Sequence, residues 1–309
     1  MEQIQKRINR LGWTLLQQTT INGLHAGNII QISVLDKHSN KKKVIYKEFA
    51  DDRNNEIDVY SKILPALESF VPVIDMWETP PHAILMNDLD RSVKNSFEHL
   101  PIESKKVTLL NILSTMAEIH TNRNIDVHSL KLEKHTITSE WYEWCLDQLN
   151  RLHALALEWY NPYWLTVIEE IHKSFYLKKY EPRGPLVLTH GDPHLDNIFI
   201  DHDGSVLLID WEWAALGSPL RDVTILMQDV YDADLINFIK VHYPKQLMEK
   251  GLTFEDKNYI NDFDYLYVDH TLMMLAWEME KFFNGYVSED KIKDIVTFKI
   301  NQLKMILRR

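Results

Sequence analysis

The stretch "LTHGDPHLDNIFIDHDGSVLLIDWE", residues 188–212, decides the fold class of this 309-residue chain. It holds two short apolar runs, "NIFI" and "VLLID", joined by "DHDG". The joining segment, Asp201 to Gly204, has the composition of a tight turn, where a glycine can adopt a positive φ. The stretch therefore predicts a β-hairpin surrounded by many carboxylate and imidazole groups.

The ends of this predicted hairpin carry oxygen-bearing side chains. Asn197 opens the first strand and Asp210 closes the second, so we expect them to pair directly, with Cα atoms about 5 Å apart. Asp192 lies on the loop that enters the hairpin. We expect the three side chains to converge, and an amide oxygen and a carboxylate at this spacing can share a hard cation such as Mg²⁺.

The first part of the chain is typical of a small β-rich unit. "GNIIQISVLD" and "KKVIYKEF", within residues 13–49, are rich in β-branched and aromatic residues, which favours strands. Residues 53–67 place Ile57, Tyr60 and Ile63 at helical spacing. Pro65 is expected to end or kink that helix. "VPVIDMWETPPHAILMNDL" then predicts two strands around a Pro-Pro turn.

After residue 88 the sequence pattern changes from strand-like to helical. "SKKVTLLNILSTMAEIH" places Val107, Leu113 and Ala117 on one helical face, and long helices follow, with the hairpin as a β island among them. We expect an α+β, two-lobed fold. Residues 1–90 would form a small β-rich lobe, and residues 91–309 a larger, mainly helical lobe.

Composition excludes several classes of protein. The net charge of −11 argues against nucleic-acid binding, which needs clustered Lys and Arg, but suits a cationic small molecule as well as plain solubility. The single cysteine, Cys145, permits no intrachain disulfide. No signal peptide precedes the first elements and no apolar run spans a bilayer. We expect a cytoplasmic protein without membrane contact, of open oligomeric state.

The motifs "HGDPHLDN", "LIDWE" and "GSPLRD" resemble those of the aminoglycoside phosphotransferase and choline kinase family, which has a protein-kinase-like fold. The resemblance implies that Asp192 is the catalytic base and that Asn197 and Asp210 bind Mg²⁺. It further implies that His190 orients the loop and that a buried Asp222 braces it. It also implies that residues 1–90 are the nucleotide-binding lobe and that residues 91–309 are the lobe for catalysis and acceptor binding. Phosphoryl transfer needs such a set: oxygen ligands for a metal, a carboxylate near the acceptor hydroxyl, and a cation on the donor phosphates.

The N-terminal half supplies the remaining groups that a kinase needs. Lys47 lies on the third candidate strand and Glu56 on the following helix, the order expected for a phosphate-binding lysine and the glutamate that holds it. "ILMNDLD" stands where the family has its hinge, so backbone groups from Met86 to Asp88 are expected to bind the adenine of ATP. A preference between ATP and GTP stays open.

The sequence also departs from the protein-kinase pattern. "INGLHAGN" offers only Gly23 and Gly27 where a glycine-rich phosphate loop is expected. Asp210-Trp211-Glu212 lacks the glycine of D-F-G, and only 11 residues separate Asp210 from Asp222. This leaves no room for a long activation segment, which favours a small-molecule acceptor. An aminoglycoside, an amino alcohol or a sugar all fit.

Two other functions are compatible with parts of the pattern. His190, Asp192 and His194 have the spacing of a zinc or two-metal hydrolase site, but this leaves Lys47 and Glu56 unexplained. A non-catalytic structural or binding protein of the spore-coat type would keep the fold without needing the metal ligands.

Several single residues have more than one interpretation. Three interpretations of Glu212 stay open: it helps to bind a second metal, it contacts a cationic substrate, or it has no role and only lies beside the site. His194 is expected on the solvent side of the loop. Acidic residues of the late helices are expected on a solvated face, with binding of a polycationic acceptor as the alternative; they are Asp269, Glu278 and Glu280. The tryptophans are expected mainly to pack the core or the lobes, while one or two of them would line an acceptor pocket; they are Trp141, Trp144, Trp159, Trp164 and Trp277.

Overall fold

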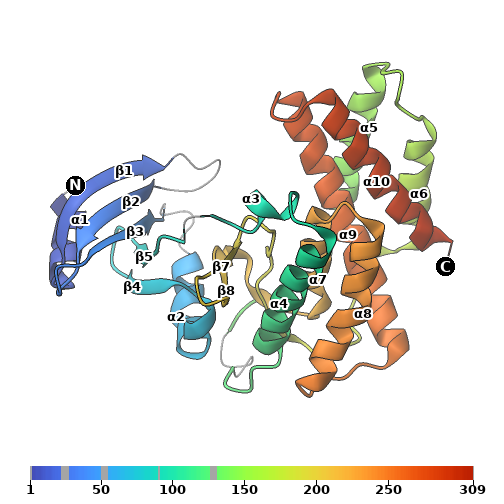
Figure 1. Cartoon of the computed structure of the whole chain (residues 1–309). Coiled ribbons are helices and arrows are strands. Elements are labelled where there is room, and N and C mark those ends of the chain that lie inside the picture. The colour runs from blue at the N-terminus through green and yellow to red at the C-terminus, as the bar shows by residue number, and fades with distance from the viewer. Residues whose placement is uncertain (1, 22–27, 50–54, 90, 126–130, 309) are drawn as a thin grey trace. The chain divides into compact units, whose positions relative to one another are not determined.

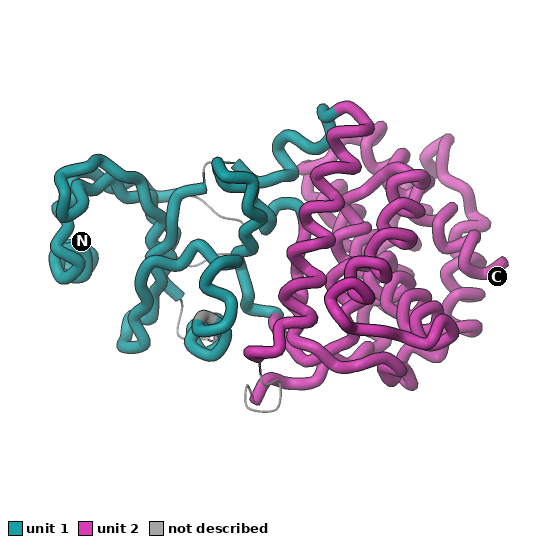
Figure 2. The backbone as a smooth tube through the Cα atoms, turned by 60° about the horizontal axis from the view of Figure 1, so that its bottom comes forward, with its two compact units in different colours: residues 1–100, 195–213 teal, residues 101–194, 214–309 magenta. Residues whose placement is uncertain are grey.

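The computed structural model describes residues 2–21, 28–49, 55–89, 91–125 and 131–308 (Figure 1). The chain forms two compact units (Figure 2). Unit 1 contains residues 1–100 and 195–213, and unit 2 contains residues 101–194 and 214–309. The predicted hairpin, which the sequence analysis grouped with the helical lobe, thus has its contacts with the N-terminal elements. Each unit is described below by itself.

Unit 1 is built on a five-stranded antiparallel sheet with the strand order β1-β2-β3-β5-β4. All the strands expected between residues 13 and 89 are present, and a helix, α1, which the sequence analysis did not predict, precedes them. The elements are α1 (Glu2–Arg10), β1 (Thr14–Ile21), β2 (Asn28–Leu35), β3 (Lys41–Glu48), α2 (Asn55–Leu67), β4 (Val73–Trp77) and β5 (Ala83–Asn87).

The alternation of β3 decides where Lys47 points. Val44 and Tyr46 are buried in the cluster that packs α1 against one face of the sheet, together with Ile32 and Ile8. Successive side chains of a strand point to opposite faces. Lys47, next to Tyr46, therefore projects from the face opposite this core.

Helix α2 has the predicted buried face, since Ile57, Tyr60 and Ile63 are all buried. The expectation that Pro65 ends the helix is wrong, because α2 continues to Leu67. Pro65 lies two residues before the end, where its missing N–H removes only one bond of the last turn. The helix therefore tolerates the proline.

The predicted hairpin is present as β7 (Ile198–Ile200) and β8 (Val206–Leu208). It lies beside α2 (Figure 1), and Val93, just before the short helix α3 (Lys94–Phe97), donates its N–H to the carbonyl of Ile198. Gly204 has the expected positive φ, 89°.

The predicted register of the hairpin is wrong by one residue. The Ile209 N–H donates to the Asn197 carbonyl over 3.1 Å, so Asn197 stands opposite Ile209 and not Asp210. Asp201 likewise pairs with Ser205, which leaves a turn of three residues rather than an even number. Three-residue turns ending in a left-handed residue are a common hairpin type, and an odd turn shifts every pair by one.

Unit 2 is mainly helical, as predicted, with one short two-stranded sheet of β6 and β9. On the predicted face of α4, Leu113 and Ala117 are buried but Val107 is exposed. The elements are α4 (Ile102–His120), α5 (Glu140–Ala154), α6 (Tyr163–Ser174), β6 (Val187–Thr189), β9 (Ala215–Gly217), α7 (Leu220–Leu226), α8 (Ala233–Glu249), α9 (Asp256–Phe283) and α10 (Glu289–Leu307).

Within the described residues, none of these helices combines the length and the apolar character that crossing a membrane would require.

Candidate active site

Lys47 lies at the centre of a buried charged cluster in unit 1. Its Nζ is 2.6 Å from Oε2 of Glu56 and 2.7 Å from Oδ1 of Asp210. Glu56 is almost fully buried at 1% exposure, and Lys47 is mostly covered. Strand β3, helix α2 and the end of the β7–β8 hairpin thus each contribute one charged group. The structure brings together three of the predicted site residues.

Asp210 reaches this cluster because the chain leaves the strand there. The residue has φ = 69°, a left-handed conformation that costs an L-residue about 1 kcal/mol and that Asp tolerates better than most. Its N–H donates to the hydroxyl of Tyr60 over 3.3 Å. A 3₁₀ turn, Trp211–Trp213, follows directly. Tyr60, fully buried on α2, holds this turn in place, a role that its helical spacing alone did not reveal.

Three carboxylates surround one ammonium group in this cluster. Burial raises the pKa of Glu56 to about 7, with Asp210 and Glu212 adding to the rise and Lys47 opposing it. Burial by itself would lower the pKa of Lys47, but attraction to Glu56 and Asp210 outweighs it and raises that pKa. Burial is thus the main cause of the shift at Glu56, and attraction to the two carboxylates is the cause of the shift at Lys47. Three carboxylates around one ammonium leave an excess of negative charge, which a divalent cation would relieve.

The donor set fits a hard cation. Glu56, Asp210 and Glu212 each present a carboxylate oxygen, and these oxygens lie within 4.8 Å of one another. Oε1 of Glu56 is buried without a hydrogen-bond partner. Carboxylate oxygens are the ligands that Mg²⁺ prefers. Asn197 lies at the same end of the hairpin, and its role as a metal ligand stays a prediction. The sequence left the role of Glu212 open; the geometry places it among the candidate metal ligands.

The other nucleotide-site predictions fall at the C-terminal end of strand β5. Met86 lies on β5, buried between β3 and β4. Asp88 follows the strand, and its Oδ2 accepts a hydrogen bond from Gln31 of β2 over 2.7 Å. The adenine-binding role of this segment stays a prediction. Gly23 and Gly27 lie outside the described residues.

The loop that carries Asp192 belongs to unit 2, and hydrogen bonds to Asp222 hold its backbone in place. The Asp222 carboxylate accepts the N–H of His190 over 2.8 Å and that of Gly191 over 2.9 Å. It also lies 2.9 Å from Nε2 of His120. Burial opposes ionisation of Asp222, but His120, His190 and Arg221 together lower its pKa to about 2. The bracing contacts expected of Asp222 are therefore present.

Asp192 itself is oriented by its neighbours. Its N–H donates to Nδ1 of His190 over 3.2 Å. One ring nitrogen of His194 lies 3.4 Å from the Asp192 carboxylate and the other 3.3 Å from Asp229. The expectation that His194 faces solvent is wrong, since its side chain is only 16% exposed. The sequence reasoning also missed Asp229, which lies 37 residues away from Asp192 and has no motif of its own.

These contacts argue against a hydrolase site at "HGDPH". Within the described ranges, the one group of three His, Cys, Asp or Glu side chains with metal-binding geometry is Glu56, Asp210 and Glu212. His190 uses Nδ1 to accept the N–H of Asp192. The histidines thus support the loop rather than share a metal.

The acidic residues of α9 are not on a solvated face. Asp269 is 1% exposed and Glu278 is 8% exposed. Glu278 pairs with Lys281 over 2.6 Å, and Glu280 accepts the indole N–H of Trp144 over 3.1 Å. The expectation of solvated carboxylates is therefore wrong for Asp269 and Glu278, because α9 is the central helix of unit 2 and most of its circumference is covered.

Most of the tryptophans pack against other aromatic rings of unit 2, as the sequence analysis expected. The Trp144 ring lies between Trp141 and Trp277, with ring centroids 5.8 and 6.4 Å away. The Trp159 and Trp164 rings form a separate pair with centroids 6.0 Å apart. The expectation that one or two tryptophans line an acceptor pocket stays a prediction.

Comparison with known proteins identifies this architecture. A family model described as "Phosphotransferase enzyme family", APH, matches residues 115–242. No curated protein matches the chain. Among solved structures, the choline kinase LicA from Streptococcus pneumoniae is 15% identical, with a TM-score of 0.58 and 98% of each chain covered.

Two other phosphotransferases are similar in the same way. Spectinomycin phosphotransferase APH(9)-Ia, in complex with ADP and spectinomycin, is 14% identical with a TM-score of 0.63, over 96% of this chain and 98% of that one. A macrolide 2′-phosphotransferase type I is 15% identical with a TM-score of 0.54, over 98% and 96%. Residues 115–242, which contain the Asp192 motif, thus match the APH phosphotransferase family model, and the chain over nearly its whole length has the kinase-like α+β fold predicted from the sequence.

Proposed function

We propose that this protein transfers the terminal phosphoryl group of ATP, bound with Mg²⁺, to a hydroxyl group of a small molecule. The observation that carries the proposal is the position of Lys47, held between Glu56 and Asp210 at 2.6 and 2.7 Å. Carboxylates that outnumber the one ammonium in a largely buried cluster are costly unless a cation balances their charge. Phosphates and a divalent cation are the ligands that this cluster suits.

Each residue has a role in the transfer. Lys47, oriented by Glu56, binds the donor phosphates. Asp210 and Asn197 would hold Mg²⁺, with Glu212 beside them, and the metal neutralises charge on those phosphates. The acceptor oxygen forms the new P–O bond while the bond from the γ-phosphorus to the ADP oxygen breaks. The hydroxyl proton passes to Asp192, whose carboxylate His194 keeps in place.

The proposed class of acceptor rests on the net charge of the chain and on the names of the similar proteins. The similar proteins are named as a choline kinase and as phosphotransferases of spectinomycin and macrolides. The net charge of −11 favours a cationic acceptor. We therefore propose an amino alcohol or an aminoglycoside as the acceptor, ATP as the donor through the segment from Met86 to Asp88, and the cytoplasm as the compartment.

Nucleotide binding is the first test. Mg-ATP is expected to raise the melting temperature of the wild-type chain by ligand linkage. Asp210→Ala should remove most of the rise, while Asp203→Ala, at the exposed turn of the same hairpin, should keep it. A wild-type chain whose melting temperature does not respond to Mg-ATP would sink the proposal in favour of a non-catalytic protein that keeps the fold.

Turnover is the second test. ADP release is measured against a panel of amino alcohols, aminoglycosides and sugars. Asp192→Asn should reduce kcat by at least a hundredfold, in line with the contribution of a general base. Asp196→Asn, whose side chain is 67% exposed, serves as the matched control. Equal turnover by both variants would show that Asp192 is not the base.

A further inference from the structure

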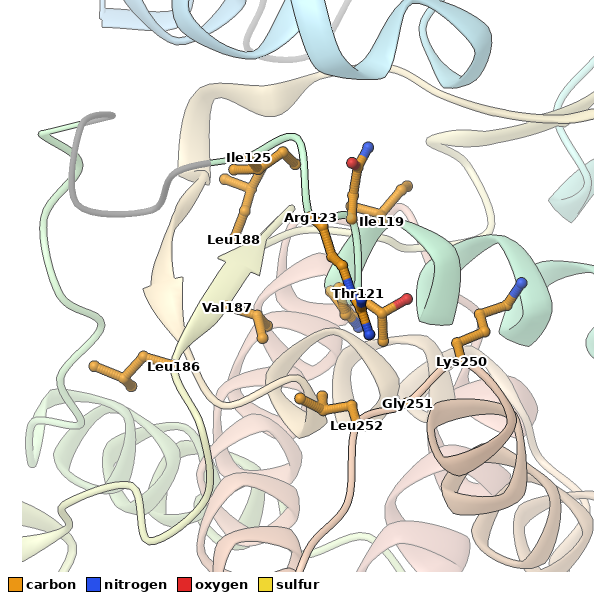
Figure 3. Close-up of a pocket in the computed structure, with 12 residues that line it drawn as sticks. Ile119, Thr121, Arg123, Ile125, Leu186, Val187, Leu188, Lys250, Gly251 and Leu252 are labelled. Carbon is orange, nitrogen blue, oxygen red and sulfur yellow. The ribbon is translucent and has the colours of Figure 1, made fainter.

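Unit 2 contains a pocket that includes none of the predicted site residues (Figure 3). It has a volume of about 230 Å³ and lies between the end of α4, strand β6 and the segment that joins α8 to α9. Apolar side chains form much of its lining; they are Ile119, Ile125, Leu186, Val187, Leu188 and Leu252. A pocket of this composition suits the apolar body of a small ligand.

The charged residues of the lining are all cationic. Arg123 and Lys250 line the pocket, and no Asp or Glu does, although the chain carries 45 acidic and 34 basic residues. Lys250 lies 3.5 Å from Glu118, which compensates one of the two charges. Arg123 forms no ion pair with any carboxylate of the described residues. Among the residues that the structure describes, the pocket therefore has one positive charge without a carboxylate partner.

Arg123 is an exposed residue whose side chain lines the pocket. Figure 3 shows the Arg123 side chain among the lining residues, near Thr121 and above Leu252 in this view. One guanidinium nitrogen lies 3.6 Å from the position that a Cβ on Gly251 would take. Gly251 has φ = 89°, a conformation in which L side chains are strained. The positive φ therefore favours glycine at this position, and the guanidinium lies within van der Waals distance of the Gly251 backbone turn.

Size and charge together define the ligand. A volume of about 230 Å³ corresponds to about eight waters at about 30 Å³ each, or an organic molecule of roughly ten non-hydrogen atoms. An arginine pairs well with a carboxylate through two parallel hydrogen bonds. One net positive charge beside six apolar side chains suits a monoanion with an apolar body.

The pocket touches the support of the Asp192 loop by two routes. His120 lines it and contacts Asp222, which accepts the N–H groups of His190 and Gly191. Strand β6 also lines it and leads directly into His190. A ligand that packs against His120 and β6 restrains both supports of the loop.

We propose that this pocket binds a small carboxylate with an apolar body, and that its occupancy stiffens the loop that carries Asp192. Binding itself does not depend on the phosphotransferase proposal; only its consequence for turnover does.

The test uses the full chain and phenylacetate, an anion of ten non-hydrogen atoms. The neutral phenylacetamide is the matched control ligand. Titration followed by NMR should give saturable phenylacetate binding that is at least fivefold tighter than that of the amide. Arg123→Gln should weaken it about tenfold, the size expected for a hydrogen bond to a charged group. Arg308→Gln, an exposed arginine at the end of α10, should leave it unchanged.

Hydrogen exchange tests the coupling. Amide exchange over residues 187–192 should slow at least twofold with phenylacetate bound, because local opening is suppressed. Equal binding of acid and amide, or full affinity in Arg123→Gln, would overturn the site. Selective binding with unchanged exchange in that segment would overturn the coupling to the loop. Neither readout uses phosphotransferase activity, so both stand apart from the proposed function.

Discussion

At the scale of single residues, Lys47 is the group around which the candidate nucleotide site is organised. It has two carboxylate partners, one on a helix and one on a hairpin. If one partner is removed, the other still neutralises the ammonium. Stability and nucleotide binding are therefore separable at this position.

The substitution Glu56→Gln should separate the stability of the fold from nucleotide binding. Lys47 keeps Asp210 as its partner and one buried carboxylate is removed, so the melting temperature without nucleotide should change little. Lys47 would no longer be held for the phosphates, so Kd for Mg-ATP should rise about tenfold, or about 1.4 kcal/mol. Calorimetric titration measures both variants, with Glu68→Gln, an exposed change just after α2, as the control. An unchanged Kd would contradict the positioning role of Glu56.

Asp269 predicts a pH dependence of stability. Burial raises its pKa to about 8, opposed by Arg221, and one of its oxygens has no hydrogen-bond partner. The folded state therefore holds a proton that the unfolded chain releases above its ordinary pKa near 3.8. This contribution to stability is complete below that value and is lost as the pH rises through about 8.

Urea unfolding between pH 5 and 9 measures this effect. The free energy of unfolding of the wild-type chain should fall with pH across this range. Asp269→Asn, which cannot ionise, should flatten the curve, and Asp294→Asn, exposed on α10, should follow the wild type. Parallel curves for wild type and Asp269→Asn would show that Asp269 is ionised in the folded chain.

At the scale of elements, the β7–β8 hairpin shows what the sequence can predict and what it cannot. The apolar runs and Gly204 predict both strands and the positive φ of the turn. They do not determine whether the turn has two, three or four residues. With any of these turn lengths, the apolar residues of each strand can still face the core. The predicted partner of Asn197 was therefore wrong by one residue, while the strands were right.

The residues that sequence reasoning missed share a physical cause. Lys47, Glu56 and Asp210 follow recognisable local patterns, so they were predicted. Tyr60, which holds the turn at Asp210, looks like any apolar member of a helical face. Asp229 meets His194 from another part of unit 2. Such contacts depend on long-range packing, and no local pattern in a single sequence records them.

Helix α7 supports the Asp192 loop through one carboxylate. Asp222→Ala would leave two backbone N–H groups and His120 without their buried acceptor. An unsatisfied buried group costs about 1–3 kcal/mol, so the free energy of unfolding should fall by about 3 kcal/mol. Chemical denaturation measures it. Asp234→Ala, in the exposed first turn of α8, is the matched control, and an equal loss in both would remove the special role of Asp222.

At the scale of the whole molecule, the sequence predicts two regions of different texture, and the structure has two units. The hairpin was assigned to the helical region because it follows it along the chain. Its hydrogen bonds join it instead to residues 93 and 94 of unit 1. Chain order is a weak guide to such pairing, since partners here are about a hundred residues apart.

The net charge of −11 leads to a prediction for the proposed phosphotransferase activity of the whole chain. With Mg-ATP saturating, raising NaCl from 50 to 300 mM should lower kcat/KM for a cationic acceptor about threefold, because salt screens long-range attraction. A neutral sugar acceptor should be unaffected. Steady-state kinetics measures both. An equal response of the two acceptors would show that surface charge does not guide the substrate.

Cys145 lies fully buried in α5, and burial raises the pKa of its thiol. Since the thiolate is the reactive form, maleimide dyes and spin labels should leave the native chain untouched. A cysteine introduced on each unit, at the exposed positions of Lys62 and Asp234, then becomes a selective attachment point in the otherwise wild-type background. A donor and an acceptor dye placed there would report, molecule by molecule, how the distance between the two units responds to nucleotide.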